Sequence, residues 1–242
     1  MKILKVIHTL YAVIIFNIIF LLFFPLFLIP IYFPSKFKLV GVLNRWWAWL
    51  FFPLTGFPWH IEYRQKLDPK KTYIFCPNHF SYLDIAIMGL NKHNTIFVGK
   101  SAMEKIPMFG FMYRNLHITV DREKLSSRYS TYTRSVAALE HGKSLVIFPE
   151  GGMVTHRPPS MGRFKDGAFR AAIEKQIEIV PVTIPYNWII LPDRKYIMLN
   201  WKPLKLIFHE PVDPTQYTLK EVAVLREKVY STIEAELKKH FP

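Results

Sequence analysis

One histidine and one aspartate, His79 and Asp84, are spaced so that they could form a proton-transfer pair. Five residues on a regular helix correspond to about 500°, so the two side chains would point about 140° apart and could not share one helical face. A turn after a strand, with Ser81 capping a helix that begins near Tyr82, would instead put Asp84 in the first helical turn, within reach of His79. The carboxylate would then orient the imidazole, whose second nitrogen could take a proton from a hydroxyl group. The alternative is that His79 only fills a turn and Asp84 only complements the helix dipole.

Two further segments carry residues that suit phosphate or hydroxyl groups. Asp121 and Arg122 end a predicted strand, and such a pair is either a solvated surface ion pair or, beside a pocket, a source of bidentate phosphate contacts. The sequence Phe-Pro-Glu-Gly-Gly at 148–152 ends another predicted strand. Its glycines allow a ligand to approach the backbone closely, and Glu150 could accept hydrogen bonds from substrate hydroxyls. The alternative is that this segment only forms a turn.

Beyond residue 60, short runs rich in Ile, Val and Phe alternate with helical patterns. The predicted strands are residues 72–76, 95–99, 116–120, 144–148, 179–184 and 204–208. The predicted helices are residues 126–140, residues 167–175, and a closing helix that follows Thr218 and Glu221 at capping-box spacing and places Val222, Leu225, Val229, Ile233 and Leu237 on one face. Pro181 within its apolar strand indicates an edge strand or a bulge. Strands interleaved with helices predict an α/β fold built on a mixed sheet, with residues 61–242 as one domain.

The first 60 residues are both basic and strongly apolar. They contain Lys2, Lys5, Lys36, Lys38 and Arg45 but no acidic residue, so they carry +5 of the formal net charge of +14. Residues 6–24 are nearly all apolar. As a helix this run would be about 28 Å long, close to the roughly 30 Å hydrocarbon core of a bilayer.

Prolines and aromatic residues follow this apolar run. Pro25 and Pro30 predict that the helix kinks or ends near Phe24. Aromatic residues then gather in a pattern typical of membrane interfaces, at Trp46, Trp47, Trp49, Phe51, Phe52, Phe57 and Trp59. Residues 1–60 are therefore predicted to be a membrane anchor, either a single span or a re-entrant helical hairpin, of which we favour the hairpin. A cleaved signal peptide fits less well, because the apolar region is too long and no small-residue cleavage site follows it.

The composition of the whole chain excludes several classes of protein. Half of the 242 residues are hydrophobic and 16% are aromatic, which excludes intrinsic disorder and collagen. Cys76 is the only cysteine, so the chain has neither an internal disulfide nor a thiolate metal cluster. A chain with 32 Lys and Arg against 18 Asp and Glu suits nucleic acid, an anionic membrane or an anionic substrate. Four of the six Trp lie beside the apolar N-terminus, which argues against nucleic acid.

Four blocks of the chain, taken in order, resemble those of the glycerolipid acyltransferase family, which includes the 1-acylglycerol-3-phosphate acyltransferases. The family's first block is Asn-His followed by four residues and Asp, the second ends in Asp-Arg, the third reads Phe-Pro-Glu-Gly, and the fourth centres on a proline between aliphatic residues. The matching residues are Asn78, His79, Ser81 and Asp84, then Asp121 and Arg122, then residues 148–151, then Pro181. The similarity also includes Lys100, Glu104, Pro107, Gly110 and residues 164–169, and it covers about residues 70–212.

This resemblance implies acyl transfer from a thioester to the hydroxyl of 1-acylglycerol-3-phosphate, which forms phosphatidic acid. His79 would act as general base on that hydroxyl, with Asp84 orienting its ring. The resemblance assigns substrate binding to Asn78, Ser81, Arg122, Glu150, Gly151 and Lys165, with Arg122, Glu150 and Gly151 at the phosphate and glycerol portion. It implies no metal or other cofactor, because acyl-CoA or acyl carrier protein brings the acyl group as a co-substrate.

Departures from the family pattern concern the acceptor more than the catalysis. Phe80 stands where glutamine is common, Leu116 where glycine is common, and Gly152-Met153 where Thr-Arg or Thr-Ser is usual. Alternative acceptors are therefore another lysolipid, a lyso-aminolipid or glycerol-3-phosphate, and the non-enzyme alternative is an inactive lipid-binding membrane protein. The expected partners are the bilayer, the lysophospholipid and the acyl donor, with no nucleic acid. The expected location is the cell membrane or an endomembrane, with the catalytic domain at the cytoplasmic surface.

Overall fold

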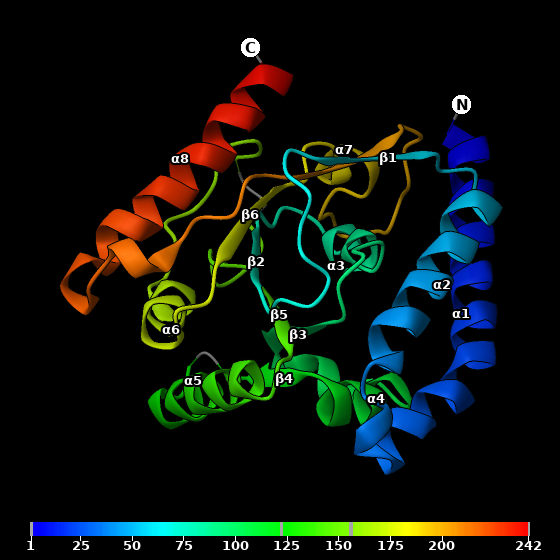
Figure 1. Ribbon diagram of the computed structural model, residues 1–242. Helices are drawn as coiled ribbons and strands as arrows, with labels where there is room; N and C mark the ends of the chain where they lie inside the picture. Colours follow the sequence, from blue (N-terminus) through cyan, green and yellow to red (C-terminus); the bar gives the residue numbers. More distant parts are fainter. Residues whose placement is uncertain (1, 122, 155–156, 242) are drawn as a thin grey trace.

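The computed structural model describes residues 2–121, 123–154 and 157–241 (Figure 1). Its strands are β1 (Trp59–Tyr63), β2 (Ile74–Pro77), β3 (Thr95–Lys100), β4 (Ile118–Val120), β5 (Ser144–Ile147), β6 (Ile179–Thr183) and β7 (Leu204–Phe208). Its α-helices are α1 (Lys2–Tyr32), α2 (Leu39–Leu54), α3 (Leu83–Met88), α4 (Phe109–Leu116), α5 (Leu125–Glu140), α6 (Gly167–Lys175), α7 (Asn187–Ile190) and α8 (Val222–His240). Short 3-10 turns are η1 (Pro34–Lys36), η2 (Ser101–Lys105), η3 (Pro214–Gln216) and η4 (Leu219–Glu221).

Within these residues the strands form one mixed sheet in the order β1-β7-β6-β2-β5-β3-β4. Neighbouring strands run parallel except for β6 and β7, whose pairing is antiparallel. The predicted mixed α/β sheet is thereby confirmed. Since β2 lies between β5 and β6, the carboxyl ends of these three parallel strands meet at one edge of the sheet. This is the edge at which parallel α/β sheets hold their functional loops.

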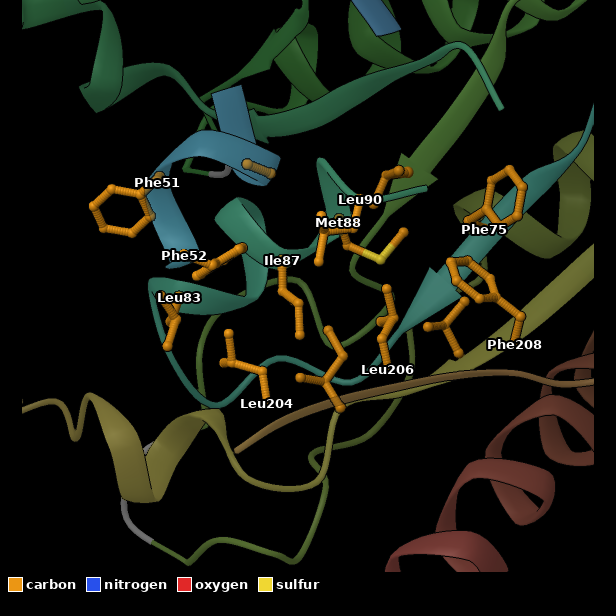
Figure 2. Close-up of a cluster of buried hydrophobic side chains, with 14 of the residues drawn as sticks. Phe51, Phe52, Phe75, Leu83, Ile87, Met88, Leu90, Leu204, Leu206 and Phe208 are labelled. Atoms are coloured by element: carbon orange, nitrogen blue, oxygen red, sulfur yellow. The ribbon is translucent and has the colours of Figure 1, made fainter. Parts of the chain in front are cut away.

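Helices cover both faces of the sheet (Figure 1). On one face, an apolar cluster joins α2, α3 and the sheet, with Phe52, Ile87 and Phe75 fully buried between them (Figure 2). On the other face α5, α6 and α8 pack on the sheet through a second cluster, which includes Leu139 and Phe169. Burial on both faces explains why the central strands are almost continuously apolar.

The first helix is longer than the sequence predicts. It continues to Tyr32 through Pro25 and Pro30, so the predicted end near Phe24 is wrong. The reason is tertiary packing, because Phe27 is buried where α1 meets α2 and α4, and Pro30 is buried as well. Such packing outweighs the loss of a backbone hydrogen bond at each proline.

The two N-terminal helices pack against each other (Figure 1). Trp47 stacks on Phe51 within α2, with ring centroids 4.8 Å apart, and the edge of Phe16 from α1 contacts both rings. Among the described helices, α1 alone is long and apolar enough to cross a membrane by length and composition.

Three predicted strand features need correction. The sequence analysis missed β1, in which Trp59 pairs with Leu204 of β7 rather than ending an aromatic run. Leu116 ends α4, so the strand predicted for 116–120 begins only at Ile118. Pro181 lies in β6, a central strand, so the predicted edge position is wrong. The predicted bulge has a counterpart on the β7 side, where the antiparallel register shifts by one residue between Val182↔Phe208 and Ile179↔Val212. The sheet tolerates this proline because the pairing of β6 with β7 begins one residue later.

The closing helix agrees with its predicted pattern. The capping box between Thr218 and Glu221 is present, with η4 as the first turn and α8 following it. Leu225, Val229 and Ile233 are completely buried against the sheet. The apolar face predicted for this helix is therefore confirmed.

Candidate active site

His79 and Asp84 lie where β2 ends and α3 begins. The Nδ1 atom of His79 is 3.1 Å from Oδ2 of Asp84, so the predicted contact is present. The same oxygen accepts hydrogen bonds from the backbone amides of Phe80 at 2.8 Å and Ser81 at 2.9 Å. Only 1% of the Asp84 side chain is exposed, against 10% of the His79 side chain. With Nδ1 donating to the carboxylate, the lone pair on Nε2 is the ring's proton acceptor.

His79 is also fixed through its backbone and its ring face. Its amide donates to Oε1 of Glu150 at 2.7 Å, and its carbonyl accepts from the amide of Val154 at 3.0 Å. The ring stacks on Phe148, with centroids 4.0 Å apart and planes 24° apart. The imidazole is thus held in one orientation by groups from two strand ends, as a positioned base requires.

Glu150 contacts the backbone rather than open space. Its Oε1 accepts from His79 and its Oε2 accepts from the amide of Gly162, both at 2.7 Å, and the residue is 7% exposed. Burial raises the pKa of this carboxyl group to about 7, and the nearby charge of Asp84 adds to the effect. The resemblance assigns Glu150 to the acceptor substrate, whereas the geometry connects it to the backbone of the candidate base.

Asn78 and Ser81 are likewise occupied by the scaffold. The Asn78 side chain donates to the carbonyl of Ile184 at 3.0 Å and accepts from its amide at 2.8 Å, which joins the ends of β2 and β6. The Ser81 hydroxyl donates to the carbonyl of Leu191 at 2.7 Å and accepts from the amide of Leu83 at 3.2 Å, near the start of α3. Both side chains are therefore placed to hold the site together.

The remaining assigned residues surround the loop that follows β5. Gly151 has φ +76°, a backbone conformation that favours glycine, and a Cβ atom there would lie 3.3 Å from Cγ of Lys165, so the lysine side chain would have to shift slightly. Lys165 is exposed, and its amide donates to the carbonyl of Pro149 at 2.7 Å, which brings its side chain beside the loop. Arg122, assigned to the acceptor phosphate, lies outside the described residues. Asp121, which precedes it, follows β4 at the same edge of the sheet but two strands away from β5.

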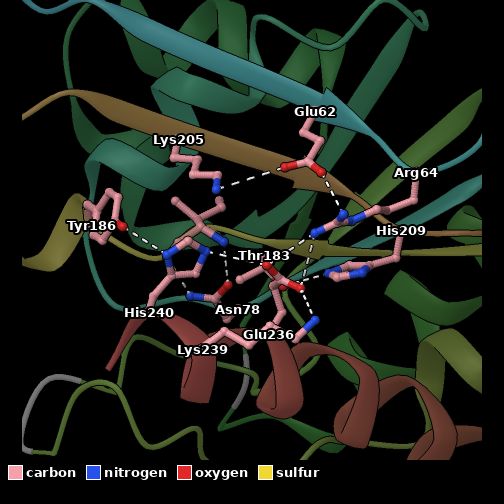
Figure 3. A network of polar contacts seen from close by, with 11 residues as sticks. Glu62, Arg64, Asn78, Thr183, Tyr186, Lys205, His209, Glu236, Lys239 and His240 are labelled. Atoms are coloured by element: carbon pink, nitrogen blue, oxygen red, sulfur yellow. Dashed lines mark hydrogen bonds and ion pairs between the residues drawn. The ribbon is translucent and has the colours of Figure 1, made fainter. Parts of the chain in front are cut away.

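A polar network fastens the last turn of α8 beside Asn78 (Figure 3). Glu236 is buried and accepts from Arg64, which follows β1, at 3.3 Å. Nδ1 of His240 lies 2.8 Å from the hydroxyl of Tyr186, two residues after the Ile184 that Asn78 binds. The network braces the end of β6 from the side opposite α3.

An apolar cavity of about 360 Å³ opens between the N-terminal helices and α3 and α4. Tyr82, Ile85 and Ala86, which flank Asp84 in the chain, form part of its wall. Most of the remaining wall comes from α1, α2 and α4, including Phe16, Phe20, Trp47, Phe109 and Met112. The sequence analysis did not predict this cavity, because its wall combines segments that lie up to 101 residues apart in the sequence, from Phe16 to His117.

A second, polar pocket lies beside the loop on the α8 side. Arg163, Arg226, Glu227 and Tyr230 line it together with Phe164, and its volume is about 370 Å³. Arg163 is the residue after the Gly162 whose amide binds Glu150. Arg226 was not among the candidate residues, since its place on the exposed side of a predicted helix gave no signal for a pocket.

Comparison with known proteins adds to this geometry. A family model described as Acyltransferase matches residues 59–185. The 1-acyl-sn-glycerol-3-phosphate acyltransferase of Haemophilus influenzae is 30% identical over 202 residues, which cover 81% of this chain and 80% of the relative. The Escherichia coli protein of the same name is 28% identical over 193 residues, which cover 76% of this chain and 75% of that relative.

A solved structure gives the same picture of the fold. The crystal structure of the 1-acyl-sn-glycerophosphate acyltransferase PlsC from Thermotoga maritima aligns with a TM-score of 0.80 over 98% of this chain and 96% of that chain. Its sequence identity is 20%, so this likeness concerns the fold alone. From the family model, the sequence relatives and the shared fold, the chain is a member of the acyltransferase family.

Proposed function

We propose that the protein transfers a fatty acyl group from a thioester to the free hydroxyl of 1-acylglycerol-3-phosphate, which yields phosphatidic acid for phospholipid synthesis. The observation that carries the proposal is the His79–Asp84 pair, with a buried carboxylate on Nδ1 and Nε2 left to take a proton. The names of the Haemophilus influenzae and Escherichia coli relatives support this acceptor.

In the proposed mechanism, Nε2 of His79 takes the proton of the acceptor hydroxyl while its oxygen attacks the thioester carbonyl. The tetrahedral oxyanion then collapses, the carbon–sulfur bond breaks, and the thiolate leaves and takes up a proton from the imidazolium. Asp84 stabilises the imidazolium between these steps. No metal or other cofactor is needed, because the thioester is already an activated acyl group.

The apolar cavity supports a place for a fatty acyl chain. Its walls are almost entirely hydrocarbon and aromatic, and Tyr82 and Ile85 connect it to the start of α3, where the catalytic pair lies. For the phosphate of the acceptor we propose Lys165, Arg163 and Arg122. Lys165 and Arg163 belong to the loop that follows β5, and Arg122 is assigned by the resemblance. Asn78, Ser81, Glu150 and Gly151 then shape the substrate site by holding its backbone.

We also propose that α1 and α2 attach the protein to one leaflet of a membrane as a re-entrant hairpin. Near the start of α1, the hydroxyl of Thr9 accepts from the amide of Leu199 at 3.0 Å, and near its end Phe27 packs with Met112 and Leu116. Since the catalytic domain packs along α1 in this way, a bilayer-spanning α1 would draw that domain into the hydrocarbon. The catalytic domain would face the cytoplasm, where both candidate donors are found.

The test is acyl transfer to 1-acylglycerol-3-phosphate in mixed micelles, followed by thiol release and product mass. We expect phosphatidic acid from the wild type and a loss of about 100- to 10,000-fold in turnover for His79→Ala. His141→Ala, which removes an exposed histidine after α5, is the matched control and should keep wild-type turnover. Equal turnover of the wild type and His79→Ala would overturn the assignment of the base.

Two further arms of the assay define the substrates. Palmitoyl-CoA and palmitoyl acyl carrier protein are compared as donors, because both present the same thioester. Glycerol-3-phosphate, a lysophospholipid without a free phosphate and a lyso-aminolipid are compared as acceptors. Faster transfer to one of these than to 1-acylglycerol-3-phosphate would replace the proposed acceptor, and the departure at Gly152-Met153 would then be its first explanation.

A further inference from the structure

An irregular segment, residues 191–203 between α7 and β7, exposes an unusual amount of apolar surface. We call it the 191–203 loop. Tyr196, Ile197 and Trp201 are 70%, 67% and 64% exposed. A connection of this length without secondary structure is uncommon in a compact domain, and large apolar side chains gathered on one usually mark an interaction site.

The loop is fastened to the start of α1 and to the end of α2. Nζ of Lys5 donates to Oδ1 of Asn200 at 2.7 Å, and the hydroxyl of Thr9 accepts from the amide of Leu199 at 3.0 Å. The indole of Trp201 donates to the carbonyl of Gly56 at 2.8 Å. The loop therefore keeps a fixed place beside the polar ends of the two N-terminal helices.

The outward face of α1 is also apolar. A stripe of exposed apolar residues runs along it at intervals of three or four positions, and further exposed apolar residues flank the stripe. The stripe consists of Ile3, Ile7, Leu10, Ile14, Ile18 and Leu21. On α2, Trp46, Trp49, Leu50 and Leu54 are also exposed. Lys5 and Thr9 of α1 bind the loop from the inward side of the helix, so the loop lies at the same end of α1 as Ile3.

The charges of the loop are mainly positive. Arg194 and Lys195 are exposed, and Lys195 places its Nζ 5.6 Å from the ring centre of Tyr196. Asp193 is the only acidic residue between 191 and 203. Tyrosine and tryptophan beside basic residues are the combination that settles at the headgroup layer, with rings at the boundary and cations on lipid phosphates.

We propose that the 191–203 loop is a second membrane contact, which inserts Tyr196, Ile197 and Trp201 at the headgroup boundary and binds anionic lipid through Arg194 and Lys195. The loop would fix the depth and tilt at which the helical hairpin lies in the leaflet. A lipid surface fits better than an acidic protein partner, since the exposed rings lie at the end of the molecule where the apolar outward face of α1 begins. This inference rests on the membrane attachment proposed above.

A fluorescent probe in the full-length protein tests insertion. Ile197→Cys carries an environment-sensitive dye, with Ala235→Cys on the exposed side of α8 as control. The native Cys76 is buried, and burial raises the pKa of its thiol, so the label goes to the introduced cysteine. On vesicles containing phosphatidylglycerol we expect a blue shift and quenching by lipid-bound quencher at position 197, and neither at position 235.

The outcomes separate this proposal from membrane attachment itself. If the wild type does not float with vesicles, attachment fails together with the loop contact. If the wild type floats but the label at position 197 stays in water, only the loop proposal is overturned. A blue shift on adding acyl carrier protein without lipid, and none with vesicles, would also overturn it and would make the loop a protein-docking surface.

Charge variants test the anionic lipid preference. Removing the two cations with Arg194→Gln and Lys195→Gln should weaken binding to phosphatidylglycerol vesicles by about five-fold per charge at low ionic strength. Binding to phosphatidylcholine vesicles should change little. The control is Lys220→Gln with Lys228→Gln, which removes two exposed cations around the start of α8. An equal loss in the control, or no loss in the loop variant, would contradict the anionic contact.

Discussion

The backbone amide of His79 lies 2.7 Å from Oε1 of Glu150, so the acid of one sequence block holds the histidine of another. The second oxygen of Glu150 binds the amide of Gly162 at the same distance. One carboxylate thus joins the end of β2, the end of β5 and the long loop that follows. This arrangement makes Glu150 a positioning residue for the proposed base, even though its carboxylate never contacts the imidazole ring.

We predict that Glu150→Gln lowers kcat and removes a pH dependence. An amide side chain offers one acceptor where two backbone amides need two, so we expect kcat to fall by about 10- to 100-fold. In the wild type the pKa of Glu150 is about 7, and protonation turns one acceptor oxygen into a hydroxyl group. Wild-type kcat should therefore fall as the pH drops through about 7, and the glutamine variant should lack this component.

The measurement is kcat between pH 5.5 and 8.5, with Glu234→Gln on α8 as the matched control. Glu234 pairs with Lys238 on the surface, so its variant should keep the wild-type profile. An acid limb near pH 7 that survives unchanged in Glu150→Gln would assign that limb to another group and contradict the prediction.

Asn78 gives a second prediction, in which stability and substrate affinity separate. Because both ends of its side chain bind Ile184, Asn78→Ala leaves a buried amide and a buried carbonyl without partners. We expect the free energy of unfolding in detergent to fall by about 2–5 kcal/mol, with KM for the acceptor unchanged. Asn115→Ala, at an exposed position of α4, is the control. A raised KM with unchanged stability would instead return Asn78 to substrate binding.

The His79–Asp84 contact and six of the strands could be predicted because their signals are local. A strand end, a helix start and a five-residue spacing together leave few geometries for His79 and Asp84. The bonds from Glu150 to His79 and from Asn78 to Ile184 could not be predicted, since the partners become neighbours only when β5 and β6 flank β2. The order of the strands in the sheet cannot be inferred from their order in the sequence.

The errors at the N-terminal end have a similar origin. Pro25 and Pro30 are strong local signals for a helix end, yet the burial of Phe27 against α2 and α4 outweighs them. Trp59 was grouped with the aromatic residues of α2. The five residues of β1 carry no local signal for a strand, because the partner strand β7 lies 145 residues later in the sequence. Tertiary contacts therefore determine both the end of α1 and the position of β1.

The apolar cavity leads to a prediction about acyl chain length. Ala86→Leu adds about three methylene groups to the cavity wall on α3 without placing a polar atom there. We expect the preferred donor to become shorter by about two to four carbons, measured by competition among acyl-CoA chain lengths. Ala235→Leu, on the exposed side of α8, should leave the preference unchanged. If Ala86→Leu lowers the rate for all chain lengths equally, the cavity does not hold the donor chain.

His209 leads to the last prediction, which concerns acid stability. It is 7% exposed, and its Nε2 lies 2.8 Å from the hydroxyl of Thr183 near the end of β6 (Figure 3). Burial lowers its pKa from 6.5 to about 4. Between these values the unfolded chain binds a proton that the folded chain does not, so folding stability is lost as the pH falls from about 6.5 to about 4.

At about 1.4 kcal/mol per pH unit, this group alone costs about 3 kcal/mol over that range. His209→Asn keeps a polar partner for Thr183 and cannot take up the proton. Denaturant unfolding at pH 7 and pH 4.5 should therefore show a smaller acid loss for His209→Asn than for the wild type, while exposed His141→Asn behaves as wild type. Identical acid losses in all three proteins would mean that His209 is protonated in the folded state, and the neutral bond to Thr183 would be wrong.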